Sequence, residues 1–389
     1  MRPFELDVEA VRACRARGAA LGESAGVTAV LERAAAGEAL ADDELVALFL
    51  SPRVSSASLL ALAHARRGGG APHIETFSPL YLTNECDGAC RMCGMRADNA
   101  DLVRETATPE TVDEQLAILH RRGIRAVALL TGEYRHGPRR DAMLGRAAAA
   151  LERAIGGGFV HVLVNIGALD AGDYPRLLAG VPRDSASRVV PQVTMCTFQE
   201  TYDPAVYARF MGDDAGNPRA DYGRRLGNFD RAADAGMWSV NPGVLLGLNP
   251  DVGFELAALL AHVRHLLARG LTVYVSLPRL RRANGTAYQA APSDDTLTRI
   301  VSVLSFGLPQ ARVVISTREA PHVQRTLLPV IGVLTPGSPG VAPYTETGAR
   351  FELEASQFEV LDHRPIEAIL GEHLAAGATI DCYEPRSCA

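Results

Sequence analysis

The sequence predicts an α/β protein whose main body is a (β/α)8 barrel of the TIM type. Between residues 77 and 335, eight short apolar runs rich in Val, Ile and Leu alternate with amphipathic stretches. Buried parallel strands alternate with covering helices in this way, and a span of this length matches the roughly 250 residues of such a barrel. A doubly wound open sheet is the structural alternative.

A helical extension is expected ahead of the barrel, over residues 1–72. Apolar side chains recur at helical spacing in residues 27–37 and 42–51. The run GGGAP at residues 68–72 then breaks the pattern, because glycine and proline favour turns over regular elements. We therefore place the barrel at residues 73–345 and a C-terminal tail, packed on the barrel, at residues 346–389.

The expected strands follow one another along the barrel, at residues 77–83, 125–131, 160–166, 189–196, 238–247, 272–278, 311–316 and 331–335. Helices are expected between them, for example at residues 109–123, 142–156, 255–270 and 294–307. Catalytic groups of such barrels sit just after the strands, at their C-terminal ends. Polar motifs at those positions therefore form the candidate site.

The composition favours a cytoplasmic protein that acts on a small molecule. Of the 389 residues, 47% are apolar, and the formal net charge is -6. No window reaches the roughly 18 consecutive apolar residues of a membrane span, and charges near the start leave no room for a signal peptide. Long basic runs, which mark nucleic-acid or membrane binding, are missing. We expect neither nucleic acid nor a membrane as partner.

Three cysteines follow the first expected strand in a short loop. Cys86, Cys90 and Cys93 are separated by three and then two residues, so one loop can surround one metal centre. Thiolates favour zinc or iron–sulfur, and a structural zinc site needs a fourth ligand, which would have to fold back from elsewhere. An iron–sulfur cluster with three protein ligands leaves one iron open for a cofactor. We expect the cluster, with structural zinc or buried thiols as alternatives.

This cysteine spacing after the first strand resembles that of radical S-adenosylmethionine enzymes. Later motifs resemble one branch of them, the aromatic amino acid lyases, and the similarity extends into the tail at residues 351–365. The motifs are YLTN at 81–84, LTGE at 130–133, QETY at 199–202, SLPRLR at 276–281 and STRE at 316–319. The resemblance implies a radical S-adenosylmethionine (β/α)8 barrel, a 4Fe–4S cluster on the three cysteines, and S-adenosyl-L-methionine as the second cofactor.

The resemblance also implies residues that bind this cofactor. Glu133 would accept from the methionine ammonium, and an acid at a helix N-terminus is the alternative. Glu200 would accept from the ribose hydroxyls, and Arg225 would hold the cofactor carboxylate, although either would also suit a surface ion pair. Met92 stands where relatives carry an aromatic residue near the adenine, and its flexible thioether can pack against that ring.

Arg318 is the candidate that would bind the amino acid substrate. A guanidinium fork matches a carboxylate in geometry and charge, and a structural arginine paired with Glu319 is the alternative. Tyr81 and Thr335 follow strands at the same end of the barrel. Each is therefore expected to hydrogen-bond the substrate.

Three lyases within the branch differ in substrate and cluster content. The hydrogenase-maturation enzyme carries an additional motif of three cysteines at its C-terminus, whereas this tail has Cys382 and Cys388. The form of the cysteine loop and the tail look closer to the tryptophan lyase than to the thiamine-pathway tyrosine lyase. We therefore expect tryptophan as the substrate.

The tryptophan hypothesis implies a defined reaction. A 5′-deoxyadenosyl radical would abstract hydrogen from the substrate amino group, and L-tryptophan would be rearranged to 3-methyl-2-indolic acid, in thiopeptide-type natural product biosynthesis. An external donor such as flavodoxin or ferredoxin would supply the electron. Tyrosine cleavage to dehydroglycine and p-cresol is the alternative, and a zinc-bound, metabolite-binding barrel is the hypothesis from a different class.

Overall fold

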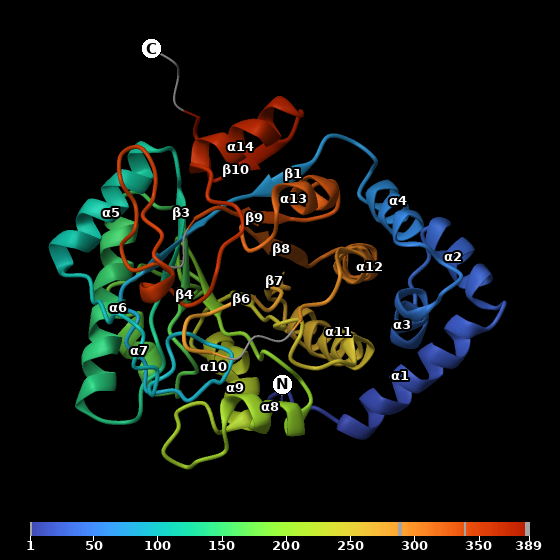
Figure 1. Cartoon of the computed structure of the whole chain (residues 1–389), viewed down its shortest axis with the longest axis horizontal. Helices are drawn as coiled ribbons and strands as arrows, with labels where there is room; N and C mark the ends of the chain where they lie inside the picture. Colours follow the sequence, from blue (N-terminus) through green and yellow to red (C-terminus); the bar gives the residue numbers. More distant parts are fainter. Residues whose placement is uncertain (1, 287–289, 338–339, 386–389) are drawn as a thin grey trace.

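The computed structural model describes residues 2–286, 290–337 and 340–385, and its centre is a curled sheet of parallel strands (Figure 1). Within these residues the sheet has ten strands, in the order β10-β1-β9-β8-β7-β6-β5-β4-β3-β2. Their bounds are β1 (His73–Glu75), β2 (Ser78–Tyr81), β3 (Ala126–Leu130), β4 (His161–Asn165), β5 (Gln192–Cys196), β6 (Ser239–Asn241), β7 (Thr272–Ser276), β8 (Arg312–Ser316), β9 (Val333–Thr335) and β10 (Thr379–Asp381).

Strands β2 to β9 are the eight predicted strands in the predicted order, so the barrel is confirmed. The hydrogen-bonded ladder does not close between β2 and β9, where a single bridge joins Tyr81 to Val341. Two strands lie outside the prediction: β1 pairs with β9 on one side and with β10 of the tail on the other. The result is a curled and incompletely closed barrel.

Most strands are shorter than their apolar runs suggested, and in β5 and β6 proline is the reason. β5 begins at Gln192, directly after Pro191, and β6 ends at Asn241, directly before Pro242. Proline has no amide hydrogen to donate to the ladder. Beyond Pro242 the chain runs beside the end of β7 and the residues after it, joined to them by isolated bridges such as the one from Gly243 to Ser276.

Helices surround the sheet on its outside (Figure 1). Several begin at a residue whose side chain caps the helix: Thr108 caps α5, Asp251 caps α11 and Ser293 caps α12, each accepting a backbone N–H of the first turn. The helices after the first strands are α5 (Pro109–Arg121), α6 (Pro138–Gly156), α7 (Asp173–Leu177), α8 (Pro204–Met211), α9 (Tyr222–Leu226), α10 (Asn228–Asp234), α11 (Val252–Ala268), α12 (Asp294–Gly307), α13 (Pro321–Leu327), η1 (Leu353–Ala355) and α14 (Ile366–Ala375).

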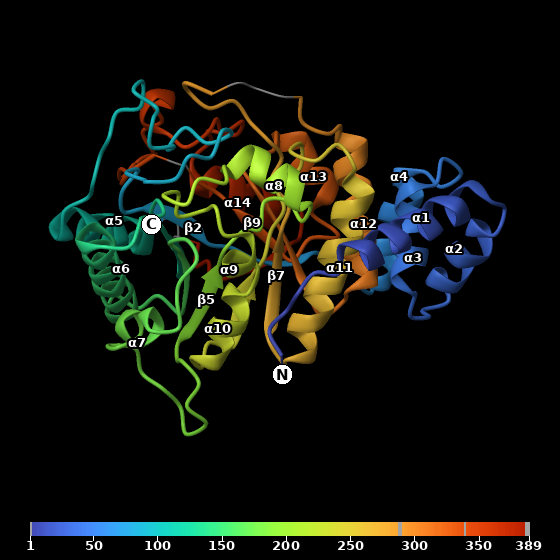
Figure 2. The ribbon, with the colours of Figure 1, turned by 90° about the horizontal axis from the view of Figure 1, so that it is seen from below.

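The N-terminal helices form a group that packs against the barrel's outer helices α11 and α12 through α1, α3 and α4 (Figure 2). They are α1 (Val8–Glu23), α2 (Val27–Ala35), α3 (Asp42–Leu50) and α4 (Ser56–Arg66). Arg299 of α12 donates to the carbonyls of Leu48, Phe49 and Ser51 at the end of α3, at 2.9, 2.7 and 2.8 Å. A cation at unsatisfied C-terminal carbonyls stabilises a helix end, which ties α3 to the barrel.

A buried polar network closes the base of the barrel, at the N-terminal ends of its strands. Glu75 on β1 accepts from Tyr274 Oη at 2.8 Å and from Arg312 Nη1 at 2.7 Å, and it also contacts His161 Nδ1. The other ring nitrogen of His161 is 2.7 Å from Thr194 Oγ1. Both carboxylate oxygens of Glu75 and both imidazole nitrogens of His161 therefore have hydrogen-bond partners.

No helix in the described part of the chain is long and apolar enough to cross a membrane. The division of the chain after residues 72 and 345 into extension, barrel and tail stays a prediction.

Candidate active site

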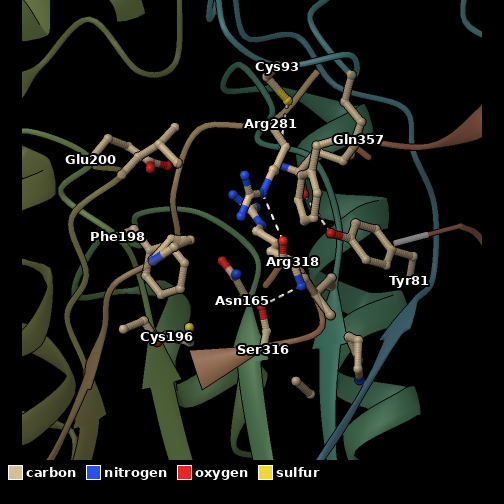
Figure 3. A pocket seen from close by; sticks show the side chains of 18 of the residues that line it. Tyr81, Cys93, Asn165, Cys196, Phe198, Glu200, Arg281, Ser316, Arg318 and Gln357 are labelled. Atoms are coloured by element: carbon tan, nitrogen blue, oxygen red, sulfur yellow. Dashed lines mark hydrogen bonds between the residues drawn. The ribbon is translucent and has the colours of Figure 1, made fainter. Parts of the chain in front are cut away.

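The strands from β2 to β9 all end at one open pocket, whose empty space, including the part open to solvent, is about 1650 Å³. Figure 3 shows part of its lining. The last residue of each strand lines it: Tyr81, Leu130, Asn165, Cys196, Asn241, Ser276, Ser316 and Thr335. All but Leu130 carry a polar side-chain atom. Two positions earlier on their strands, Ala128, Leu163 and Val314 are apolar and buried. Because side chains alternate along a strand, the pocket has an apolar floor and a polar rim.

The cysteine loop reaches this pocket directly from β2, and all three cysteines line it. The loop packs so closely on Gly132 that a Cβ there would lie 2.1 Å from the carbonyl oxygen of Glu85. The backbone N–H groups of Gly88 and Glu133 donate to Cys86 Sγ at 3.2 and 3.3 Å. Two loops from neighbouring strands thus shape the site around this sulfur.

The donor set fits a cluster better than a single ion. Among residues 2–286, 290–337 and 340–385, no three His, Cys, Asp or Glu side chains are placed to hold one metal ion. A cluster spreads its ligands over different irons, so its thiols need not converge on one point. Desolvation raises the pKa of the three thiols to about 11, and a bound metal reverses this because a coordinating thiol is deprotonated. The zinc hypothesis lacks a ligand set here.

A buried group of charges stands beside the cysteine loop and includes the predicted cofactor-binding residues. Glu133 accepts from Arg225 Nη1 at 2.8 Å and from the backbone N–H of Ala168 at 3.0 Å. Glu200 accepts from Arg219 Nη2 at 2.9 Å, and its φ of 70° places it in the left-handed region. Glu133 lies ahead of α6, outside its first turn, so the helix-terminus alternative does not apply.

Met92 faces an apolar wall of the pocket. It is buried with Tyr207, Phe210, Leu245 and Leu280, which come from α8 and from the loops after β6 and β7. Met92, Leu245 and Leu280 all line the pocket. A flat aromatic ligand beside the cysteine loop would therefore meet thioether and methyl groups.

Arg318 lies in the loop after β8, and it has no acidic partner among the described residues. Its guanidinium carbon is 3.2 Å from the ring centroid of Phe358, a cation–π stack. Glu319 is bound instead by Arg279 Nε at 3.0 Å and by Arg281 Nη2 at 2.8 Å, so the alternative pairing does not form. Desolvation lowers the pKa of Arg318 to about 10, which leaves it cationic at neutral pH.

Tyr81 and Thr335 also line the pocket. The Tyr81 hydroxyl donates to Gln357 Oε1 at 2.5 Å, and Thr335 is 6% exposed at the end of β9. Both lie on the rim that Arg318 shares. Their contacts with substrate stay predictions.

The sequence-based prediction missed several residues of the pocket, among them Asn165, Arg219, Gln357 and Phe358. Asn165 ends an expected strand, so its position alone could have revealed it, and no described residue binds its side-chain amide (Figure 3). Arg219 pairs with Glu200 from an irregular loop. Gln357 and Phe358 come from the tail, where no local pattern indicates that they return to the strand ends.

Known proteins share the fold of this chain. No protein family model matches the chain. Over 361 residues it is 26% identical to the 2-iminoacetate synthase of Escherichia coli (strain K12), a match that covers 89% of this chain and 88% of that protein. The FeFe-hydrogenase maturase HydG from Carboxydothermus hydrogenoformans gives a TM-score of 0.82 at 24% identity, covering 98% of this chain and 86% of that one. Another HydG structure gives 0.81 at 26% identity, covering 96% and 80%.

Proposed function

We propose that this chain, a radical S-adenosylmethionine lyase related to the aromatic amino acid lyases, cleaves L-tyrosine between Cα and Cβ to p-cresol and dehydroglycine. The similarity to 2-iminoacetate synthase supports this substrate, because 2-iminoacetate and dehydroglycine are the same compound. The pocket supports it as well. Its apolar floor suits an aromatic ring, and its polar rim suits the charged groups of an amino acid.

The cofactors are a 4Fe–4S cluster and S-adenosylmethionine. We assign the cluster to Cys86, Cys90 and Cys93. Two backbone N–H groups donate to Cys86 Sγ and stabilise negative charge on that sulfur. When bound, the two cofactors supply a 5′-deoxyadenosyl radical that abstracts hydrogen from the substrate. The methionine part of the cofactor carries one ammonium and one carboxylate, and the Glu133–Arg225 pair offers the two complementary charges 2.8 Å apart. Glu200 is assigned to the ribose hydroxyls.

The main observation behind the proposal is that the guanidinium of Arg318 is desolvated at the pocket without an acidic partner among the described residues. A desolvated cation without a counter-ion is costly, so a bound carboxylate is its natural partner. Phe358 covers one face of the guanidinium and leaves its edge free for a two-pronged contact. We assign the substrate carboxylate to Arg318 and the substrate amino group to Tyr81 and Thr335.

Asn165 extends this assignment to the substrate ring. A phenol hydroxyl both donates and accepts hydrogen bonds, and so does a side-chain amide. Asn165 lies on the rim across from the tail, with its amide unclaimed by any described residue (Figure 3). On this assignment Asn165 gives the hydroxyl of a tyrosine substrate a polar partner at the rim, two positions beyond Leu163 of the apolar floor.

Tryptophan is the second candidate. The cysteine-loop form Arg91-Met92-Cys93 favours the tryptophan lyase NosL and its product 3-methyl-2-indolic acid, whereas the similarity to 2-iminoacetate synthase favours tyrosine. We give the second observation more weight because it spans most of the chain. A role in antibiotic biosynthesis depends on the tryptophan hypothesis.

A single assay tests both substrates. Anaerobically reconstituted protein is reduced with dithionite and incubated with S-adenosylmethionine and either tyrosine or tryptophan, and the products are identified by mass spectrometry. We expect 5′-deoxyadenosine and p-cresol from tyrosine. Formation of 3-methyl-2-indolic acid from tryptophan alone would overturn the substrate and keep the lyase. Iron-loaded protein that forms no 5′-deoxyadenosine would overturn the proposal as a whole.

The electron donor and the location are parts of the same proposal. An external one-electron donor such as flavodoxin or ferredoxin would reduce the cluster, and a cytoplasmic location would supply both donor and amino acid.

A further inference from the structure

The tail segment at residues 352–362 forms part of the pocket wall and is held there by its backbone. The N–H of Gly94 in the cysteine loop donates to the carbonyl oxygen of Gln357 at 3.0 Å, and the N–H of Leu361 donates to that of Thr317 at 3.0 Å. A Cβ on Gly94 would lie 3.0 Å from the same Gln357 oxygen. These contacts fix the segment between the cysteine loop and the end of β8.

Gln357 uses this position to join two residues of the site. Its Nε2 donates to Cys93 Sγ at 3.5 Å, and its Oε1 accepts from the Tyr81 hydroxyl at 2.5 Å (Figure 3). A cluster-bound thiolate accepts hydrogen bonds and cannot donate. The amide nitrogen must therefore face Cys93, which turns the amide oxygen toward Tyr81.

This orientation decides what Tyr81 can offer the pocket. Its only hydroxyl proton is committed to the Gln357 carbonyl oxygen, so the phenol oxygen presents lone pairs to a ligand. Desolvation raises the pKa of Tyr81, so the hydroxyl keeps that proton at neutral pH. A ligand group that meets Tyr81 must therefore donate an N–H or O–H.

We infer that Gln357 is a positioning residue that stabilises the cluster ligand Cys93 and orients Tyr81 as the acceptor for the substrate amino group. The second half of this inference rests on the proposed function, and the first half rests only on the cluster. An N–H bond to sulfur stabilises the reduced, more negative cluster, so Gln357 raises its reduction potential.

The test replaces the amide with an apolar chain of similar length, Gln357→Met. We expect the variant to bind four irons per chain, to show a more negative cluster potential in an EPR-monitored redox titration, and to raise KM for the amino acid about tenfold, as the loss of a charge-assisted hydrogen bond predicts. Glu354→Gln, on the exposed surface of the same segment, is the control and should change neither quantity.

Tyr81→Phe separates the two halves of the inference. It removes the hydroxyl but leaves the Gln357–Cys93 contact, so KM should rise about tenfold while the potential stays at the wild-type value. The double variant should match the larger single effect on KM, because both residues act through one chain of hydrogen bonds. Independent, multiplying effects would overturn the coupling.

Two further results decide the remaining cases. If the Gln357→Met variant does not assemble the cluster, Gln357→Glu serves in its place. Glutamate keeps the size of the side chain but replaces the N–H donor with a negative charge, so the reduction potential of the cluster should lie below the wild-type value by more than in Gln357→Met. A wild-type potential in both variants would overturn the role toward Cys93. If no aromatic amino acid is turned over, the proposed function fails, yet the redox titration still tests the contact with the cluster ligand.

Discussion

The two ends of the barrel both bury charged groups, and among the described residues these groups are hydrogen-bonded more completely at the base than at the mouth. At the base, Glu75 has three partners and His161 has two. At the mouth, Arg318 has no acidic partner, and Glu319 Oε1 and Arg219 Nε are buried without a hydrogen bond among the described residues. A fully hydrogen-bonded buried network favours one fold. Buried charged or polar groups without partners are costly unless a ligand supplies the missing contacts.

The difference suggests that residues at the base serve the stability of the fold and that residues at the mouth serve its function. Changes at the base should lower stability and spare the chemistry of the folded fraction. Changes at the mouth should do the reverse, because a charge that no protein group neutralises contributes little to folding.

The largest expected effect is loss of the cluster. Cys90→Ala removes one of the three thiolates at the mouth that we assign to the cluster, and it should abolish bound iron and 5′-deoxyadenosine formation, measured by iron analysis and chromatography. Cys382→Ala, beside the base, is the matched control and should keep both. Equal iron in the two variants would remove Cys90 from the cluster.

Arg318→Met should raise KM for the amino acid by about 10- to 100-fold, since charge-assisted hydrogen bonds contribute about 1.5–3 kcal/mol. Loss of an unpaired, desolvated cation should also leave the melting temperature unchanged or higher. Steady-state kinetics and thermal denaturation measure the two effects. A variant with wild-type KM would place the substrate carboxylate elsewhere.

Arg312→Met at the base is the matched comparison for Arg318→Met. Arg312 is bound to Glu75, so its loss should lower the melting temperature and leave KM unchanged. If both variants change KM equally, the contrast between the two ends is wrong.

Glu75→Leu should lower the free energy of unfolding by about 3–5 kcal/mol, as removal of one partner from a buried ion pair does. Burial opposes the charge, but the hydrogen bonds from His161 and Tyr274 prevail and lower the pKa of Glu75. Its contribution is therefore present above the unfolded pKa of 4.5 and is lost as the pH falls through the lower folded value. Urea denaturation of both proteins should show their difference shrinking in acid.

The smallest expected effect concerns Glu255 in α11, which accepts from Thr201 Oγ1 at 2.6 Å and from the N–H of Tyr202 at 2.8 Å. Burial outweighs these bonds and raises the pKa of Glu255 from 4.5 to about 7. The folded state then binds a proton that the unfolded state has lost, so stability should fall as the pH rises between these values, by at most about 1.4 kcal/mol per pH unit. Glu255→Gln should flatten this slope in urea denaturation, and an unchanged slope would assign it to another group.

The sequence by itself determined the barrel and the position of its catalytic end. Strand and helix periodicities are local, and the spacing of the three cysteines lies within one short loop. The existence of strands β2 to β9 and the grouping of Cys86, Cys90 and Cys93 could therefore be predicted from short stretches of the chain. Arg318 follows as well, because it lies just beyond a strand end.

Only the tertiary structure decided which of these groups meet. Glu133 and Arg225 are 92 positions apart, and Cys93 and Gln357 are 264 positions apart, and no periodic pattern links residues across such distances. Their contacts depend on how helices and tail pack around the strand ends. The same packing leaves Arg318 without an acidic partner in the described part of the chain, because Glu319, its neighbour in sequence, turns toward two other arginines.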